Sequence, residues 1–191
     1  MSLSFTSRHS HESPDWYTPY LYVEAARAVM GGIDLDPASD AIANELIHAT
    51  QYYTVEDDGL QHPWAGRIFL NPPGGQVNAF WRKLVTSAGV TEFIWIGYSL
   101  EQLQTLQVSM GHLVTPLDFS LCFPKRRIAF MENEVRRKQR EVKLIAQGKP
   151  FTKKNGPTHA NYIAYGGTHP GTFFTVFSHF GKVLLVPPDA E

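Results

Sequence analysis

The sequence predicts an α/β fold built on a doubly wound, mainly parallel sheet with a basic helical insert. Short apolar runs alternate along the chain with amphipathic helical patterns, which is typical of a sheet covered by helices on both faces. The run Phe93-Ile94-Trp95-Ile96-Gly97 is apolar throughout, as in a strand buried on both sides. A second apolar run stops at Asn71-Pro72-Pro73, because proline fixes φ and has no N–H for a sheet hydrogen bond.

The limits of the elements follow from hydrophobic spacing and capping residues. Predicted helices cover residues 20–30, 41–50, 76–88, 99–110, 134–147 and 171–180. Predicted strands cover residues 33–35, 67–70, 93–97, 116–123, 127–131, 161–165 and 183–186. In the first helix we expect Thr18 to be the N-cap, Pro19 the first helical residue and Gly31 the terminator.

The first predicted strand leads into a turn, Asp36-Pro37-Ala38-Ser39-Asp40, in which Ser39 or Asp40 can cap the following helix. An acid at the end of a strand, followed by small residues, is a common way to hold a ribose hydroxyl or the amino-acid part of a cofactor. The same residues also make a good capping turn that binds no ligand. Both interpretations of this turn stay open at this point.

Asn71 lies at the end of the predicted strand over residues 67–70. Ligands of open α/β sheets bind at the carboxyl edge of the strands, so the Asn71 side chain is a candidate site residue. The alternative is a strand followed by a Pro-Gly turn without a function. The next helix carries four apolar residues at the spacing of a buried face, and these predict core packing: Val77, Phe80, Trp81 and Leu84.

Composition indicates an ordinary soluble globular protein. Hydrophobic residues make up 43% of the chain and charged residues 18%, which is not the composition of a disordered chain. No apolar run approaches the roughly 20 residues of a membrane span, and the single cysteine, Cys122, excludes an internal disulfide and a cysteine-based zinc site. We therefore expect a cytoplasmic protein without a membrane or metal partner, with a disordered tail over residues 1–14 and one domain over residues 15–191.

Charge is distributed unevenly along the chain. Residues 121–155 hold eleven Lys and Arg against three acids, a net charge of +8, whereas the remainder has six bases and fifteen acids, or −9. A basic insert on an acidic body suggests an anionic polymer as partner, and nucleic acid is favoured over membrane because no apolar face accompanies the charges. Within the insert the predicted helix over residues 134–147 aligns three bases in one stripe: Arg136, Arg140 and Lys143. The alternative is a solvated basic helix without a partner.

Several enzyme classes are disfavoured by the motifs that the sequence lacks. Its eight histidines are scattered without the spacing of a helical metal site, and it has neither a Walker phosphate loop nor a Gly-x-Ser-x-Gly turn. Cys122 lies in an apolar run, which predicts a core residue rather than a nucleophile. Hydrolases that use a metal or a covalent serine therefore lose support.

Five short motifs, taken in order, resemble the phage-type DNA adenine-N6 methyltransferases of the Dam-like family. The motifs are Trp16-x-Thr18-Pro19, Asp34-Leu35-Asp36-Pro37-Ala38, Asp57-Asp58-Gly59-Leu60, Trp64-x-Gly66 and Asn71-Pro72-Pro73. The resemblance runs from about Trp16 to Trp81 and becomes diffuse after Trp95. It implies a Rossmann-like sheet of the S-adenosylmethionine methyltransferase type and methyl transfer to adenine N6 in DNA, in the host cytoplasm if the protein is phage-encoded.

The resemblance also assigns roles to residues of this chain. The catalytic residues would be Asn71, Pro72 and Pro73, since the Asn71 oxygen and the Pro72 carbonyl would accept the adenine amino hydrogens. The S-adenosylmethionine contacts would be Thr18, Pro19, Asp36, Pro37, Ala38, Ser39 and, near its adenine, Asp58. Asp36 would end either the first cofactor strand or the ribose-binding second strand. Near the flipped base the DNA contacts would be Gly74, Gly75 and Tyr98. The charge of the basic segment, rather than the resemblance, adds as expected DNA contacts Lys125, Arg126, Arg127, Arg136, Arg140, Lys143, Lys153 and Lys154.

The chain departs from the family pattern in two places. Gly74-Gly75 stands where members usually carry an aromatic residue that stacks on the flipped base, and the usual Gly-x-Gly of the cofactor loop is missing. Stacking of a base on an aromatic ring contributes roughly 1–3 kcal/mol, which Tyr98 or an aromatic of the basic segment would have to supply. The alternatives are an inactive nucleic-acid-binding relative and an enzyme that modifies another amino group on the same scaffold. The sequence specifies no oligomeric state.

Overall fold

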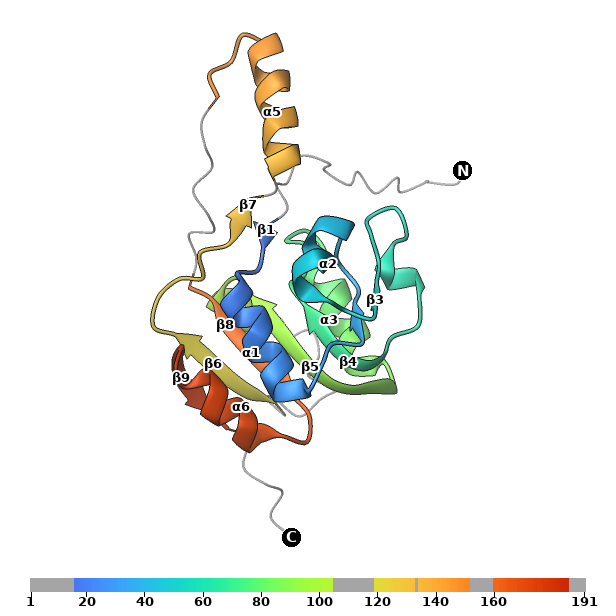
Figure 1. Cartoon of the computed structure of the whole chain (residues 1–191), viewed down its shortest axis with the longest axis vertical. Helices are drawn as coiled ribbons and strands as arrows, with labels where there is room; N and C mark the ends of the chain where they lie inside the picture. Colours follow the sequence, from blue (N-terminus) through green and yellow to red (C-terminus); the bar gives the residue numbers. More distant parts are fainter. Residues whose placement is uncertain (1–15, 105–118, 133, 152–159, 186–191) are drawn as a thin grey trace.

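A computed structural model describes residues 16–104, 119–132, 134–151 and 160–185 (Figure 1). The main sheet consists of β2 (Leu35–Asp36), β3 (Gln51–Tyr52), β4 (Ala65–Leu70), β5 (Gly89–Gly97), β6 (Ser120–Pro124), β8 (Tyr162–Gly166) and β9 (Gly181–Leu184). The helices are α1 (Tyr20–Met30), α2 (Ala41–Ile47), α3 (Val77–Thr86), α5 (Glu134–Ala146) and α6 (Pro170–Phe177), with a 3₁₀ turn η1 (Gly59–Gln61). Two further strands, β1 (Trp16–Tyr17) and β7 (Met131–Glu132), form a separate ribbon.

The main sheet is mixed. Its strand order is β3-β2-β4-β5-β8-β6-β9, and the pairs β3–β2, β2–β4 and β4–β5 are parallel. The pairs β5–β8, β8–β6 and β6–β9 are antiparallel. Strands β3, β2, β4, β5 and β6 therefore run in one direction, and β8 and β9 run in the opposite direction. The expectation of a mainly parallel sheet holds in this sense, although only the half that carries Asp36 and Asn71 has parallel pairing.

Helices cover both faces of the sheet, as the alternating pattern predicted. On one face α1, α2 and α6 pack against strand residues such as Phe69, Ile94 and Ile96. On the other face α3 packs with Trp95 and Leu70. Successive residues of β4 and β5 point to opposite faces of the sheet, so a strand covered on both sides must be apolar throughout.

Most long elements lie close to their predicted positions, but several ends differ. The predicted cap of α1 is wrong: Pro19 occupies the N-cap position, and no side chain caps the helix. Of the two candidates for α2, Asp40 is the cap, and its Oδ1 accepts the Ala43 N–H at 2.8 Å. α2 ends at Ile47 rather than at residue 50, because His48 adopts a left-handed conformation with φ 50°. Thr18 and Ser39 are therefore not used as helix caps.

Three short strands differ from the predictions. The patterns predicted no strand at β1 or β3, and the strand expected over residues 127–131 is limited to β7. β7 pairs with β1 outside the main sheet, with Trp16 opposite Glu132 and Tyr17 opposite Met131. In Figure 1 this ribbon lies between the main sheet and α5, and α5 projects from it away from the sheet.

Part of the predicted structure lies outside the described residues. This holds for the tail over residues 1–14, for the second half of the helix expected over residues 99–110, and for Lys153 and Lys154; helical residues are described at positions 100–104. Among the described helices none is both long enough and apolar enough to cross a membrane.

Candidate active site at the carboxyl edge of the sheet

The site lies where the winding of the sheet changes direction. From β2 the chain moves outward to β3, then returns across β2 to β4 and continues to β5. Such a switch point leaves the carboxyl ends of the two central strands without a crossing connection above them, which is where ligands of open α/β sheets bind. Here the two strands are β2 and β4, which are paired at Leu35 and Ile68. Asp36 ends one of them and Asn71 follows the other.

Asn71 is held by a backbone carbonyl. Its Nδ2 donates to the Trp16 oxygen at 2.8 Å, and the side chain is part-buried. A carbonyl oxygen only accepts hydrogen bonds, so this contact settles which end of the amide is which. Among the described residues none donates to Asn71 Oδ1, so the amide presents a hydrogen-bond acceptor at the edge of the sheet.

The segment of Trp16, Tyr17 and Thr18 crosses this edge and connects its two strands. Trp16 holds Asn71 on the β4 side, while Tyr17 Oη donates to Asp40 Oδ2 at 2.8 Å on the β2 side. Asp40 in turn caps α2. The amino-terminal motif therefore contacts Asn71 of the last motif and, two residues beyond the second motif, Asp40 of the turn after β2.

Asp36 is a buried acid. Its side chain accepts the Ala38 N–H at 3.1 Å, and its main chain pairs with Tyr53. Burial raises the pKa of Asp36 to about 7, although the Ala38 N–H and the nearby Ser39 hydroxyl favour the charged form. The Ser39 hydroxyl lies close enough for this electrostatic effect without meeting the geometry of a hydrogen bond. Asp36 therefore changes its protonation state near neutral pH.

Two buried hydroxyls near this turn have no hydrogen-bond partner among the described residues, Thr18 Oγ1 and Ser39 Oγ. Thr18 is only 3% exposed. A buried hydroxyl without a partner is destabilising by roughly 1–3 kcal/mol, so such groups in a native structure call for an explanation. The two hydroxyls flank the Tyr17–Asp40 contact, and both occupy positions that the sequence assigned to cofactor binding.

The loop after β3 that holds Glu56, Asp57 and Asp58, called the acidic loop, packs against the turn after β2. A Cβ on Gly59 would lie 2.0 Å from the Pro37 oxygen, so only glycine permits this close approach. The Trp64 indole N–H donates to the Gly59 oxygen at 2.8 Å, which holds the loop in place. Asp58 has a positive φ of 53°, and its carboxylate accepts the Leu60 N–H of its own turn. Asp58 is thus close to the predicted cofactor residues, with its carboxylate partly used within the loop.

The turn after Asn71 is open to solvent at its glycines. Pro72 is buried, whereas Pro73, Gly74 and Gly75 are exposed. A Cβ built on Gly74 or Gly75 meets no described atom within 4 Å, and neither residue has a positive φ. Tyr98 follows the carboxyl end of the neighbouring strand β5 and is half-buried beside the second core. The described structure therefore leaves room for a Cβ at position 74.

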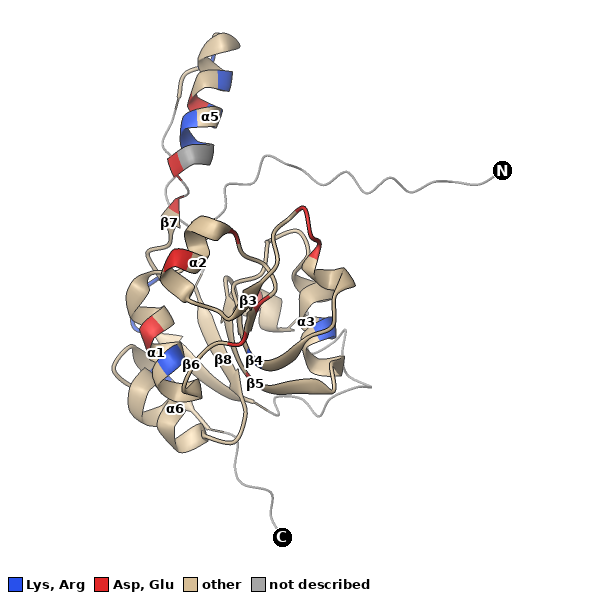
Figure 2. Cartoon of the chain, turned by 45° about the vertical axis from the view of Figure 1, so that its right-hand side comes forward, with Lys and Arg blue, Asp and Glu red and all other residues tan. Residues whose placement is uncertain are grey.

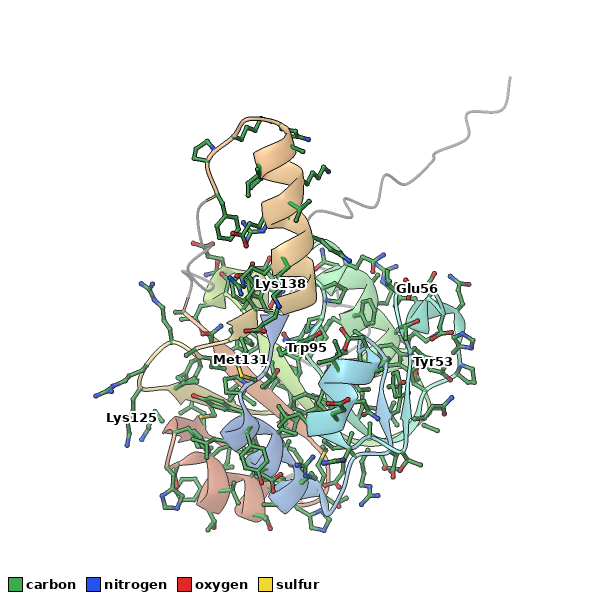
Figure 3. The ribbon with its side chains drawn as sticks, turned by 45° about the horizontal axis from the view of Figure 1, so that its top comes forward. Tyr53, Glu56, Trp95, Lys125, Met131 and Lys138 are labelled. Carbon is green, nitrogen blue, oxygen red and sulfur yellow. The ribbon has the colours of Figure 1, made fainter. Side chains whose placement is uncertain are left out.

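The basic residues predicted to contact DNA fall into two groups (Figures 2 and 3). Lys125, Arg126 and Arg127 are exposed after β6, and Figure 3 shows Lys125 extending away from the body of the molecule. The other group is on α5, where Figure 2 shows several Lys and Arg positions, while acids mark the loop after β3. Lys143 is exposed there, and the Arg136 side chain lies outside the described part of the chain.

Arg140 has an internal role in addition to its charge. Its Nη2 donates to Glu132 Oε1 of β7 at 2.5 Å, and its guanidinium lies over the Phe151 ring, 5.0 Å from the centroid. The Arg140 side chain is 19% exposed and that of Glu132 is 8% exposed. Arg140 therefore differs from the solvent-exposed stripe residue that helical spacing predicted, because it attaches α5 to the ribbon.

Cys122 is a core residue, as the sequence predicted. It is fully buried, its thiol donates to the Phe177 oxygen at 3.6 Å, and burial raises the pKa of the thiol to about 12. A thiol with this pKa holds almost no thiolate at neutral pH, so it is a poor nucleophile.

Sequence reasoning missed the parts played by Trp16, Tyr17 and Glu132. The first two belong to a motif that was recognised, but roles were assigned only to Thr18 and Pro19. Trp16 acts through its carbonyl, which no side-chain pattern reveals. Tyr17 and Glu132 act through partners 23 and 8 residues away, Asp40 and Arg140.

Comparisons with known proteins found no relative of this chain. No protein-family model matches the chain, and no curated protein or solved structure matches it significantly. Within the described residues no group of three His, Cys, Asp or Glu side chains is arranged to hold a metal ion.

Proposed function

We propose that this protein transfers a methyl group from S-adenosylmethionine to the N6 amino group of adenine in DNA. The observation that carries the proposal is the orientation of the Asn71 amide. Its nitrogen is bound to the Trp16 carbonyl, so its oxygen is the end that a substrate amino group would meet. The position of Asn71 at the switch point of the sheet gives further support.

The chemistry requires an acceptor at this position. The lone pair of the adenine amino nitrogen is delocalised into the ring, which makes that nitrogen a poor nucleophile. Asn71 Oδ1, together with the Pro72 carbonyl, would accept the two amino hydrogens and localise the lone pair on nitrogen. Bound S-adenosylmethionine supplies an electrophilic methyl group on a sulfonium. The methyl group would bond to N6 as its bond to sulfur breaks with the electron pair kept by sulfur, and the extra N6 proton would pass to solvent from the amino group held by Asn71 Oδ1 and the Pro72 carbonyl.

The residues at the carboxyl end of β2 fit a cofactor rich in hydroxyl and amino groups. Thr18 and Ser39 offer two buried hydroxyls without partners in the described structure, and Asp36 offers a buried carboxylate. A ribose or an amino-acid group would satisfy these atoms and remove the desolvation penalty. Pro19, Pro37 and Ala38 would form the apolar contacts, and the Asp58 loop would lie near the cofactor's adenine.

The basic segment would bind the DNA backbone. Lys125, Arg126 and Arg127 are exposed, and the predicted contacts of Arg136, Lys143, Lys153 and Lys154 stay predictions. Electrostatic attraction of this kind is independent of sequence and places the substrate. The target base would have to leave the duplex to reach Asn71. Tyr98 and the exposed turn at Gly74-Gly75 lie at the edge where that base would arrive.

A second function is favoured by Gly74-Gly75. Without an aromatic residue after the Pro-Pro pair, base stacking is weakened, and the chain could be an inactive relative that binds nucleic acid. The two unpartnered hydroxyls favour the enzyme, since a protein without a cofactor gains nothing from burying them. Transfer to another amino group on the same scaffold is the third possibility, and the identity of the product distinguishes it.

The test is label transfer from radioactive S-adenosylmethionine to mixed-sequence DNA, followed by mass spectrometry of the nucleosides. Asn71→Ala should reduce turnover by about 100-fold or more, because it removes a group that acts on the transition state, while the dissociation constant of the cofactor stays within about threefold. Asn78→Ala, on the exposed face of α3, is the matched control. Gly74→Tyr should raise kcat/KM by roughly tenfold, because its Cβ meets no described atom and its ring would restore base stacking.

Each outcome favours one function. Label on N6-methyladenine that depends on Asn71 supports the proposal. DNA binding without label or cofactor affinity would support the inactive relative instead. Label on another nucleoside would support a different amino acceptor, and an Asn71→Ala variant with full turnover would show that the catalytic assignment is wrong.

A further inference from the structure

We propose that the β1–β7 ribbon couples nucleic-acid binding by the basic helix α5 to the orientation of the Asn71 amide, with Glu132 and Arg140 as positioning residues. The inference rests on the proposed function for its substrate. It assigns roles to Glu132 and Arg140, which lie outside the candidate site at the ends of β2 and β4. Its basis is a continuous series of contacts between α5 and Asn71.

The first contact joins Asn71 to the ribbon. The Trp16 carbonyl accepts the Asn71 Nδ2–H at 2.8 Å. Because the bond uses the backbone, any shift of β1 changes the direction of the Asn71 amide and of its acceptor oxygen. A hydrogen-bond acceptor acts on a transition state only when its position is fixed to a fraction of an ångström.

The second contact joins β1 to β7. The two strands are antiparallel, with Trp16 opposite Glu132 and Tyr17 opposite Met131. Two residues on each side make a marginal ribbon when isolated. Its position therefore depends on what holds its two ends, which are the sheet edge through Asn71 and Asp40 on one side and α5 on the other.

The third contact joins β7 to α5. Glu132 Oε1 accepts from Arg140 Nη2, and the pair is largely buried, with 8% and 19% of the two side chains exposed. The Phe151 ring covers the Arg140 guanidinium from the other side. Removing one partner of a largely buried ion pair is strongly destabilising, because the other charge remains desolvated. The chain itself joins β7 to α5, which begins two residues after Glu132, and the Glu132–Arg140 pair adds a side-chain contact that restrains the direction of α5 relative to the ribbon.

The consequence is that α5, called the arm below, and the Asn71 amide move together. Nucleic acid that binds the Lys and Arg side chains of α5 would shift a helix that is fixed to the ribbon. The ribbon carries the Trp16 carbonyl that orients Asn71. Without the Glu132–Arg140 pair the arm would still attract phosphates by its charge. It would deliver them without a fixed relation to Asn71, so turnover falls while affinity for DNA is retained.

Trp16 supplies a direct readout of the ribbon. The chain has four tryptophans, and three of them are buried in the core: Trp64, Trp81 and Trp95. Trp16 is half-exposed on the ribbon. A change in tryptophan emission on addition of DNA to the wild-type protein should therefore come from Trp16, and Trp16→Phe should remove it while leaving the backbone carbonyl in place.

The experiment is a titration of the full chain with a short mixed-sequence duplex, in which emission, anisotropy of the labelled duplex and methyl transfer are measured. For Glu132→Gln we expect the emission change to fall at least about threefold and kcat to fall about tenfold, with the dissociation constant of DNA within about threefold of wild type. Arg140→Lys, which keeps the charge and removes the fork geometry, should behave in the same way. Glu134→Gln removes the same charge from the exposed first turn of α5 and should leave all three measurements unchanged.

The outcomes separate this inference from the proposed function. DNA binding by the wild type without an emission change, or equal emission changes in wild type and Glu132→Gln, would overturn the coupling and leave the enzyme assignment intact. An emission change that depends on Glu132, with no methyl on adenine N6, would overturn the enzyme assignment and leave the coupling intact. A wild type that binds no DNA would overturn both. Thermal unfolding of each variant identifies one that fails to fold, and the other pair variant then decides.

Discussion

Asp36 is a residue whose chemistry is strongly altered by the fold. Burial raises the pKa of its carboxyl from 3.8 to about 7, so the folded protein holds a proton that the unfolded chain has already released. Between these two values the folded state binds more protons than the unfolded state, and stability falls as the pH rises. Above about pH 7 both states are ionised at this position and the effect is constant.

This predicts a pH dependence that one substitution removes. The free energy of unfolding of the wild type should decrease between pH 4.5 and pH 8, and Asp36→Asn should lack the part due to Asp36, roughly 2–4 kcal/mol for a shift of this size. Urea unfolding of both proteins across this pH range measures the difference. Parallel curves for the two proteins would show that Asp36 is not a protonated buried acid.

At the residue scale the sequence predicted that Asn71 and Asp36 would lie at strand ends, and it did not predict how the atoms around them are arranged. Asn71 and Asp36 could be identified because an apolar run that ends in a polar residue followed by proline can be recognised in the sequence alone. The bond between Asn71 and Trp16 spans 55 positions, so nothing local indicates it. Thr18 has the residue type of a helix cap, yet in the structure its hydroxyl is buried without a described partner.

Among the elements, the basic segment differs most from the rest of the molecule. Its exposed bases at positions 125–127 lie after β6, whereas acids line the loop after β3 (Figure 2). A polyanion is therefore attracted to one part of the surface and repelled from another. If DNA is the substrate, as we propose, this distribution would set the orientation in which it approaches the sheet edge.

The prediction at this scale concerns salt. Replacing Lys125, Arg126 and Arg127 together by alanine should weaken DNA binding at all sequences and reduce the slope of log K against log salt by about 0.9 for each phosphate that is no longer neutralised. Arg82→Ala, on the exposed face of α3, should change neither quantity. Anisotropy titrations at several salt concentrations measure both, and an unchanged slope in the triple variant would remove these residues from the interface.

Helices and strands could be predicted where their own residues show the apolar spacing of that element. α1, α3, β4 and β5 are long enough for apolar spacing to identify them, and the core residues of α3 were all predicted. β1, β3 and β7 have two residues each, which is too short for any periodicity. They exist because distant partners pair with them, and one of them, β1, holds Asn71.

At the scale of the whole molecule, the contact between β5 and β8 joins the parallel half of the sheet to the antiparallel half. Gly97 and Tyr162 pair there, and a Cβ on Gly97 would lie 2.1 Å from the Tyr162 ring. The ring is fully buried, and its hydroxyl binds Trp95 Nε1 and Gln102 Oε1. The ring therefore has no free direction in which to move.

We expect Gly97→Ala to destabilise the protein by about 1–3 kcal/mol, because an added methyl in a packed core forces its neighbours off their preferred positions. Gly171→Ala is the matched control, since position 171 lies in α6 with no described atom within 4 Å of the added Cβ, and it should be neutral or stabilising by up to about 1 kcal/mol. Chemical denaturation of both variants tests this, and equal stability would show that the β5–β8 contact can adjust.

The late position of β8 in the chain has a consequence for synthesis on the ribosome. β8 comprises residues 162–166, yet it lies between β5 and β6, which precede it by many residues. A growing chain that has been synthesised only as far as β6 therefore contains β5 and β6 without β8, the strand that pairs with both. Sheets that depend on such distant pairing close slowly and expose unpaired strand edges meanwhile. Nascent chains stalled before residue 162 should be sensitive to protease and bind chaperones, whereas chains extended past residue 184 should resist digestion.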